Sequence, residues 1–341
     1  PYYVDGSTAP LSKEGTFIGH HIMVPKKGVA VHINAFNFPI WGMLEKIAVN
    51  LMAGVPAVVK PSEFTSYLTE LMVQEIIASA ILPKGALQLV AGKGRGILEH
   101  VTNQDVVTFT GSAKTGKLLK ALPNIIEESV AFNLEADSLN ACVLGTDAVP
   151  GTEEFDLFIK EVQKEITVKT GQKCTAVRRI LVPENLIEDV EKALIGRLKK
   201  TTIGDPSIEG VRMGALASIE QVSRVKENVE LLMSDQKVIY GNMENYELVG
   251  GNKDKGAFFP SILFRNDDPF QHTLVHEVEA FGPVSTLIPY KDLNEAIELV
   301  EMGKGSLVTS IVTANDKLAT EFVTETAHVN GRMLVLNARC A

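Results

Sequence analysis

The 341-residue sequence contains only three cysteines, too few for the disulfide framework that small secreted proteins use. It has no apolar run of about 18 residues, the length that a membrane-spanning helix needs. The N-terminus lacks the charged and apolar segments of a signal peptide. These absences favour a reducing compartment, and we expect a cytoplasmic protein without a membrane partner.

Basic residues are also in the minority. Lys plus Arg number 33 against 42 for Asp plus Glu, which gives a formal net charge of -9. No basic run and no interleaving of aromatic and basic residues is present, so we expect no nucleic acid partner. What the sequence does have is a 45% hydrophobic content, over a length that can bury a large core in two domains.

Apolar runs alternate with helical patterns along most of the sequence. In the first part we predict strands at residues 28–35, 57–60, 87–90, 106–109 and 130–132, and helices at 40–53, 67–80 and 113–122. Later we predict strands at 141–144, 179–182, 284–288 and 307–312, and helices at 153–169, 186–200, 219–233 and 293–302. This rhythm predicts an α/β fold with parallel, doubly wound sheets. We place the domain boundary near residues 137–140, with one domain at 1–139 and another at 140–341.

Polar side chains follow four of the predicted strands in the first part. They are Asn37, Lys60, Ser112 and Glu135. Ligands of doubly wound sheets bind at the carboxyl ends of the strands, so this edge is the expected binding site.

One cysteine stands apart from the apolar core pattern. Cys174 lies in Thr170-Gly171-Gln172-Lys173-Cys174-Thr175, after a helical run and before an apolar strand, among small and polar residues. Cys142 lies in Asn140-Ala141-Cys142-Val143-Leu144 and has the surroundings of a core residue. A nucleophilic thiol needs a low pKa, exposure and a partner, so the spacing alone leaves both a nucleophile and a small turn residue open for Cys174.

Motifs around Cys174, taken in chain order, resemble those of the aldehyde dehydrogenase family. They are Ala35-Phe36-Asn37-Phe38-Pro39, Val58-Val59-Lys60-Pro61-Ser62-Glu63, Phe109-Thr110-Gly111-Ser112, Asn133-Leu134-Glu135, Gly171-Gln172-Lys173-Cys174 and Glu279-Ala280-Phe281-Gly282-Pro283-Val284. The similarity runs from about Phe17 to about Asn337. Residues 132–140, where most relatives carry Glu-Leu-Gly-Gly-Lys, and the Val-Leu-Asn ending at Asn337 resemble one branch. This branch is the aldehyde dehydrogenase half of bifunctional ring-opening enzymes of phenylacetate catabolism.

The resemblance implies an NAD(P)-dependent oxidoreductase with a Rossmann-like cofactor domain and a catalytic thiol domain. Cys174 is the expected nucleophile. Attack of a thiolate on an aldehyde creates an oxyanion, for which Asn37 is the expected hydrogen-bond donor. Glu135 is the expected base that activates water to hydrolyse the thioester. Because Ala136-Asp137 replaces the usual Gly-Gly, Asp137 is the alternative base.

Cofactor contacts also follow from the resemblance. From the adenosine end to the nicotinamide end they are Lys60 and Glu63, Gly111 and Ser112, and Glu279 and Phe281. A helix that opens after Gly111 offers N–H donors to a pyrophosphate. A carboxylate near the ribose 2′ position favours NAD, whereas the resembled branch is associated with NADP and a CoA-linked semialdehyde. We expect NADP to be accepted and preferred, with NAD possible.

The ends of the sequence suggest a trimmed chain. Pro1 is not a natural start, and the last residues follow a strand-like stretch directly. By the resemblance we expect an N-terminal helical segment, a C-terminal oligomerisation region and a hydratase-like domain outside the present chain. The full-length protein is expected to be a homo-oligomer that acts on a small-molecule aldehyde.

Other patterns leave alternatives open. Residues 111–117 match most of the phosphate-binding P-loop motif. The motif requires Ser or Thr at position 118, but this residue is Leu, which has no hydroxyl for magnesium. Residues 92–96 carry an incomplete dinucleotide fingerprint, which we interpret as a loop. His272 and His276, followed by Glu277, could share a helix face, but no further metal ligands of matching spacing are present. A CoA-acylating dehydrogenase and an inactive scaffold of this fold are the remaining alternatives.

Overall fold

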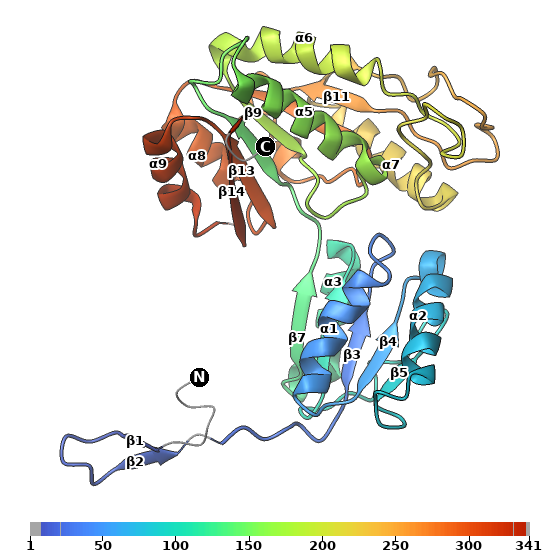
Figure 1. The fold of residues 1–341 in the computed structure, drawn as a ribbon, viewed down its shortest axis with the longest axis vertical. Helices are drawn as coiled ribbons and strands as arrows, with labels where there is room; N and C mark the ends of the chain where they lie inside the picture. The colour runs from blue at the N-terminus through green and yellow to red at the C-terminus, as the bar shows by residue number, and fades with distance from the viewer. Residues whose placement is uncertain (1–7, 21, 330, 339–341) are drawn as a thin grey trace. The chain divides into compact units, whose positions relative to one another are not determined.

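The computed structural model describes residues 8–20, 22–329 and 331–338. The chain divides into two compact units, and the division falls between Ala136 and Asp137. Each unit is built on one sheet with helices packed against it (Figure 1). A short antiparallel pair, β1 (Thr8–Pro10) and β2 (Ile18–His20), precedes the first sheet.

The first sheet has the strand order β5-β4-β3-β6-β7, and all of its neighbouring strands are parallel. Its elements are β3 (Ala30–Ile33), α1 (Trp41–Met52), β4 (Ala57–Lys60), η1 (Glu63–Thr65), α2 (Ser66–Ala78), β5 (Leu87–Leu89), β6 (Val106–Thr110), α3 (Ala113–Lys120), α4 (Pro123–Glu127) and β7 (Ala131–Glu135). The strand order reverses between β3 and β6. In a doubly wound sheet this switch point opens a crevice at the carboxyl ends of the strands.

Both faces of the first sheet are covered. On one face Val59 packs with Met43 of α1 and Val73 of α2. On the other face Val31 and Val107 pack in a second cluster. Burial on both sides explains why these strands are almost continuously apolar.

The second sheet has the order β10-β11-β12-β9-β8-β13-β14, and every neighbouring pair is parallel except β10 and β11. Its strands are β8 (Ala141–Leu144), β9 (Arg179–Pro183), β10 (Lys237–Tyr240), β11 (Ile262–Arg265), β12 (Val284–Tyr290), β13 (Val308–Val312) and β14 (Arg332–Leu336). Its helices are α5 (Glu153–Thr167), η2 (Val168–Gly171), η3 (Glu184–Leu186), α6 (Ile187–Leu198), α7 (Ile219–Leu232), η4 (Thr273–His276), α8 (Leu293–Glu301) and α9 (Asp316–Thr326).

Four parallel strands form the centre of the second sheet, in the order β12, β9, β8 and β13. The amino ends of parallel strands lie at the same edge of a sheet. The segments that enter these four strands therefore meet at one edge, although they are far apart in the sequence.

The predicted α/β fold with doubly wound sheets is confirmed, and the main differences lie at element ends. The helix predicted at 153–169 ends at Thr167, because Val168 is extended (ψ 131°) and Lys169 and Thr170 then adopt left-handed backbone angles. The strand predicted at 130–132 is shifted and extends to Glu135, so this carboxylate stands on the last strand residue. Helices α4 and α9, strands β10 and β11 and the β1–β2 pair were not predicted, whereas β14 is the strand-like stretch noted before the last residues. Within the described ranges, no helix is long and apolar enough to cross a bilayer.

Candidate active site

Cys174 lies on a loop whose backbone is turned by three successive left-handed residues. They are Lys169 (φ 52°), Thr170 (φ 52°) and Gly171 (φ 68°), which lie within the short segment η2 that follows α5. Left-handed angles are unfavourable for a β-branched residue, and the Thr170 hydroxyl offsets this by donating to the Gly214 carbonyl at 3.1 Å. A Cβ at Gly171 would overlap the Gly282 carbonyl oxygen, so only glycine fits.

The backbone after this turn is held by two buried amides. Gln172 accepts from the Ala217 N–H at 2.9 Å and donates to the Phe281 carbonyl at 3.3 Å. Asn140 donates to the carbonyl oxygens of Cys174 (2.8 Å) and Ala176 (2.9 Å). The loop is therefore fixed from the segments that lead into β8 and β12.

The two described cysteines differ as the sequence predicts. Cys142 is 2% exposed on β8, and burial raises the pKa of its thiol to about 12. Cys174 is partly exposed. The pKa of Lys169 is lowered, chiefly by burial and then by Lys173, while Cys174 acts in the opposite direction. Lys173 itself pairs with Glu165 at 2.6 Å. The surroundings of Cys174 suit a nucleophile, and those of Cys142 suit a core residue.

Glu279 and Phe281 lie at the same edge of the second sheet, in the segment that enters β12. The Glu279 side chain is 4% exposed, and it accepts from Arg178 Nε and from the Ser138 N–H, both at 3.1 Å. Burial raises the pKa of Glu279 to about 7, while Arg178 and the Ser138 N–H act in the opposite direction. The guanidinium of Arg178 also lies 5.5 Å from the centre of the Phe281 ring.

Asn37 is presented by the turn between β3 and α1 in the first unit. The carbonyl oxygens on both sides of it accept from threonine hydroxyls, Phe36 from Thr65 and Pro39 from Thr69, each at 3.2 Å. These bonds tie the turn to η1 and α2 and fix its backbone. The side chain of Asn37 is half-buried.

Glu135 ends β7 in the first unit and is 31% exposed. Its Oε2 accepts from the Thr110 hydroxyl at 3.4 Å and lies 4.0 Å from Lys46 Nζ. Sequence reasoning did not single out Lys46, although a lysine between buried Met43 and Ile47 on α1 was a usable signal. The alternative base, Asp137, is exposed and is the first residue of the second unit.

Lys60 and Glu63 lie at the carboxyl edge of the first sheet, at the end of β4 and the start of η1. Burial lowers the pKa of Lys60 and Glu63 raises it, so the two side chains interact. The glycine-rich residues 92–96 form a loop, as predicted, and a Cβ at Gly94 would lie 2.9 Å from Lys60 Cγ. This loop therefore covers the aliphatic stem of Lys60.

Gly111 and Ser112 join β6 to α3. Ser112 is the N-cap of α3, and its hydroxyl accepts from the Thr115 N–H at 3.3 Å. The Gly111 N–H donates to the Glu135 carbonyl at 3.1 Å, and a Cβ on this glycine would lie 2.7 Å from the Phe109 ring. The segment is thus a close turn at the switch point of the sheet, at the N-terminus of α3.

Asn34 provides a test of whether this edge fits a dinucleotide. It follows β3 directly, its backbone N–H donates to the Lys60 carbonyl at 3.0 Å, and the residue is 5% exposed. Neither Oδ1 nor Nδ2 of its side chain has a hydrogen-bond partner within the described ranges. Buried amides are normally paired, so an unpaired one beside Lys60 fits an edge that binds a polar ligand.

His272 and His276 do not form the shared face considered from the sequence. His272 precedes η4 and is exposed, whereas His276 is buried. His276 Nδ1 lies 3.1 Å from Arg179 Nη1, and its Nε2 lies 3.1 Å from the Pro269 carbonyl oxygen. Because Arg179 can only donate, His276 is neutral with its proton on Nε2. In the part of the chain that the structure describes, no three His, Cys, Asp or Glu side chains are placed to hold a metal ion.

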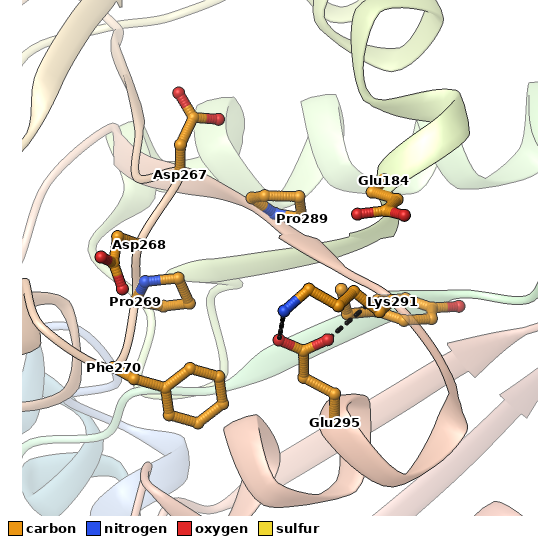
Figure 2. Close-up of a pocket in the computed structure, with 9 residues that line it drawn as sticks. Glu184, Asp267, Asp268, Pro269, Phe270, Pro289, Lys291 and Glu295 are labelled. Atoms are coloured by element: carbon orange, nitrogen blue, oxygen red, sulfur yellow. Dashed lines mark hydrogen bonds and ion pairs between the residues drawn. The ribbon is translucent and has the colours of Figure 1, made fainter.

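A separate hollow of about 320 Å³ lies at the carboxyl ends of β9 and β12 (Figure 2). Acidic residues from several segments line it, and Lys291 lies 3.6 Å from Glu295. Cys174 and Glu279 precede β9 and β12, so they lie at the other edge of this sheet. None of the predicted site residues lines this hollow.

The fold and the site define a class: two doubly wound units, one with a dinucleotide-type edge and one with an accessible thiol on a fixed loop. The chain belongs to the aldehyde dehydrogenase family, whose sequence profile matches residues 3–334. This finding confirms the resemblance deduced from the sequence motifs.

Three individual relatives illustrate how similar the chain is to other members of the family. The chain is 43% identical over 334 residues to 3,4-dehydroadipyl-CoA semialdehyde dehydrogenase of Aromatoleum evansii, which covers 98% of the chain and 65% of that relative. It is 30% identical to 2,5-dioxopentanoate dehydrogenase of Saccharolobus solfataricus, with 94% and 64% covered. The crystal structure of Staphylococcus aureus betaine aldehyde dehydrogenase with NAD+ superimposes with a TM-score of 0.79 at 26% identity, over 90% of the chain and 59% of that enzyme. The chain thus spans about two thirds or less of these relatives.

Proposed function

We propose that this chain carries the NAD(P)-dependent oxidation of an aldehyde to a carboxylic acid, with water as the source of the second oxygen. The observation that carries the proposal is Cys174: a partly exposed thiol that follows a left-handed turn and whose carbonyl oxygen is held by the Asn140 amide. Backbone strain next to a partly exposed thiol is typical of a nucleophile. Membership of the family supports the same chemistry.

In the proposed reaction the Cys174 thiolate attacks the aldehyde carbon. The oxyanion that forms accepts hydrogen bonds from the Asn37 amide and the Cys174 backbone N–H. The cofactor, when bound, supplies the acceptor for the hydride that leaves this carbon. The chain then holds a thioester on Cys174. Glu135, oriented by Thr110 and Lys46, removes a proton from water as it attacks the thioester, which releases the acid and restores the thiolate.

The residues proposed to hold the cofactor lie on both units. The adenosine ribose faces Lys60 and Glu63, and the pyrophosphate faces Gly111 and the N-terminus of α3 after Ser112. Phe281 and Glu279 are proposed on the nicotinamide side, where a ribose hydroxyl has to share the carboxylate with Arg178. The orphaned side chain of Asn34 supports a polar ligand at the adenosine edge.

We infer a preference for NADP over NAD. Lys60 can offset part of a 2′-phosphate charge, and Glu63 is exposed, so it can turn away from the ribose. Measuring kcat/KM for both cofactors in the wild type and in Glu63→Gln tests this. A strong NAD preference in the wild type that relaxes in the variant would overturn it.

The substrate class proposed is a CoA-linked semialdehyde, of the kind released when an aromatic compound such as phenylacetate is opened. The name of the Aromatoleum relative supports the CoA-linked semialdehyde, and the aromatic source follows from the resemblance of the sequence motifs. Glu135 favours hydrolysis of the thioester over transfer to coenzyme A. The P-loop alternative is disfavoured because Leu118 stands where a magnesium-binding hydroxyl is needed.

The proposed mechanism is tested with three variants. Cys174→Ala should abolish NAD(P)H production while cofactor binding remains, whereas Cys142→Ala should keep turnover and cost only stability. Glu135→Gln should give one burst of reduced cofactor and then stall as the thioester. Substantial turnover without Cys174 would falsify the mechanism, and a normal steady-state rate in Glu135→Gln would move the base to Asp137 or solvent.

A further inference from the structure

Arg178 connects three segments at the amino edge of the second sheet. Its Nε donates to Glu279 Oε1 at 3.1 Å, Nη1 donates to the Gly282 carbonyl at 2.7 Å, and Nη2 donates to the Gly171 carbonyl at 2.8 Å. Gly171 belongs to the turn that carries Cys174, and Glu279 and Gly282 belong to the segment that enters β12. Each of the three guanidinium nitrogens therefore has its own acceptor.

This arrangement is specific to arginine. The guanidinium is planar and rigid, so its three nitrogens fix the relative positions of the groups that accept from them. A lysine ammonium is a point charge on a flexible stem and cannot define the same plane. The Arg178 side chain is 5% exposed and the Glu279 side chain 4%, so water replaces none of these contacts.

Stability alone does not explain this buried pair. Moving two charges out of water costs several kcal/mol per ion, and apolar replacements of similar size are often as stable. Burial works against the charged form of Glu279, and Asp137 adds repulsion, while Arg178 and the Ser138 N–H favour the charged form. This costly ion pair lies between the Cys174 loop and the segment that enters β12. Its location indicates that it holds these two segments in place.

We propose that Arg178 is a positioning residue that clamps the Cys174 loop to residues 279–282, with Glu279 as its fixed counter-ion. The clamp rests on the proposed function, because it sets the position of the nucleophile against the segment that faces the nicotinamide. It acts through Gly171 and Gly282 rather than on the substrate. Hydride transfer needs the Cys174 loop and residues 279–282 at a fixed distance from each other. We therefore expect its rate to depend on the three hydrogen bonds of the Arg178 guanidinium.

Two readouts without aldehyde turnover test the clamp in the full chain. Hydrogen–deuterium exchange of the cofactor-free protein should show faster exchange in residues 171–176 and 279–283 together once Arg178 is replaced. Acylation of Cys174 by p-nitrophenyl acetate needs no cofactor, and it should stay within about twofold of the wild type. In the presence of aldehyde and NADP, the burst of NADPH should slow by about tenfold or more.

The variants leave no buried charge unpaired, so that an effect on exchange or on the burst is not caused by misfolding. Arg178→Lys keeps a charge for Glu279 but loses the three fixed donors. Arg178→Met with Glu279→Gln removes both charges together, and it is read by exchange and acylation alone because Glu279 is itself a proposed cofactor contact. Arg265→Met is the matched control, because Arg265 also bonds several carboxylates, Glu188 at 2.6 Å and Glu191 at 2.9 Å, but none near Cys174. The control should leave exchange in both segments and the burst unchanged.

Several results would overturn the clamp. The clamp is wrong if hydrogen exchange stays unchanged in the two segments or rises in only one of them. It is also wrong if Arg178→Lys shows wild-type exchange and a wild-type burst, or if acylation falls in parallel with the burst. A wild-type protein that forms no NAD(P)H from any aldehyde refutes the proposed function instead. In that case the exchange and acylation data still decide the clamp.

Discussion

Arg178 and Arg179 are neighbours in the sequence but bond to different parts of the second unit. Arg178 turns to the Cys174 loop, whereas Arg179 donates through Nε to the Leu139 carbonyl at 2.8 Å and through Nη2 to the Val300 carbonyl at 3.2 Å. Successive residues of a strand point to opposite faces, which explains the divergence. Burial lowers the pKa of Arg179 to about 9. At the start of β9, Arg178 thus holds the Cys174 loop, whereas Arg179 holds the end of α8.

The substitution Asn34→Leu tests whether the buried, unpaired side-chain amide of Asn34 serves cofactor binding. Removing a buried, unpaired polar group should raise the stability of the cofactor-free protein by about 1–2 kcal/mol and weaken NADP binding. Thermal unfolding with and without NADP measures both effects. Asn124→Leu is the control, because Asn124 donates to the Leu98 carbonyl at 2.6 Å and its loss should destabilise. Equal destabilisation by both substitutions would show that Asn34 has partners in solution.

His276 should make the protein sensitive to acid. Burial and Arg179 lower its folded pKa to about 4, below the ordinary value of 6.5. As the pH falls below 6.5 the unfolded chain takes up the proton first, so stability is full above pH 6.5 and is lost towards pH 4, by about 3 kcal/mol. Denaturant unfolding at several pH values measures this loss.

His276→Gln supplies the matching acceptor and donor without a proton that titrates in this range, so its stability should vary less between pH 6.5 and 4. His100→Gln is the control, since His100 is exposed, and it should leave the wild-type pH profile unchanged. A profile of His276→Gln that follows the wild type would contradict the assignment.

At the scale of elements, the end of α8 packs too closely for a larger residue. A Cβ at Gly303 would overlap Arg179 Nη2, so Gly303→Ala should destabilise the protein by about 1–3 kcal/mol. Gly196 in α6 has open space around its Cβ position, so Gly196→Ala should stabilise by about 1 kcal/mol. Denaturant unfolding of the two variants should give opposite signs, and a neutral Gly303→Ala would show that Arg179 can move.

Elements with strong periodicity could be predicted from the sequence. The strand predicted at 57–60 is β4, and the helix predicted at 219–233 is α7 within one residue. Helix α9 was missed because it buries few side chains, among them Ala319 and Phe322. Strands β10 and β11 are short and lie among polar loops, so their alternation is weak.

Candidate site residues could be named from the sequence, but their surroundings could not. Motif position identified Cys174 and Glu279. The bond between Arg178 and Glu279 spans 101 residues and follows from the pairing of β9 with β12, which no local pattern encodes. For the same reason the carboxyl-edge rule did not predict that the Cys174 loop lies at the amino edge of its sheet.

At the scale of the molecule, the two units have separate cores. Val59 and Val107 belong to clusters formed within the first unit, and Phe158 belongs to a cluster formed within the second. Calorimetric unfolding should therefore resolve two transitions. Phe158→Ala should lower one of them and Val59→Ala the other, each by several degrees, since large-to-small core changes cost about 2–5 kcal/mol. A single transition that both substitutions lower equally would contradict this independence.

The strand order of the second sheet also fixes when the site can form during synthesis. Strand β9 pairs with β8 on one side and with β12 on the other, and β13 later joins the far side of β8. The 101 residues from Arg178 to Glu279 take about 5–20 s to translate at typical rates. Throughout that interval the growing chain carries Cys174 without the carboxylate and carbonyl that hold Arg178. Under the proposed clamp, Cys174 is therefore held in position only after β12 has paired with β9, and the proposed aldehyde chemistry begins no earlier.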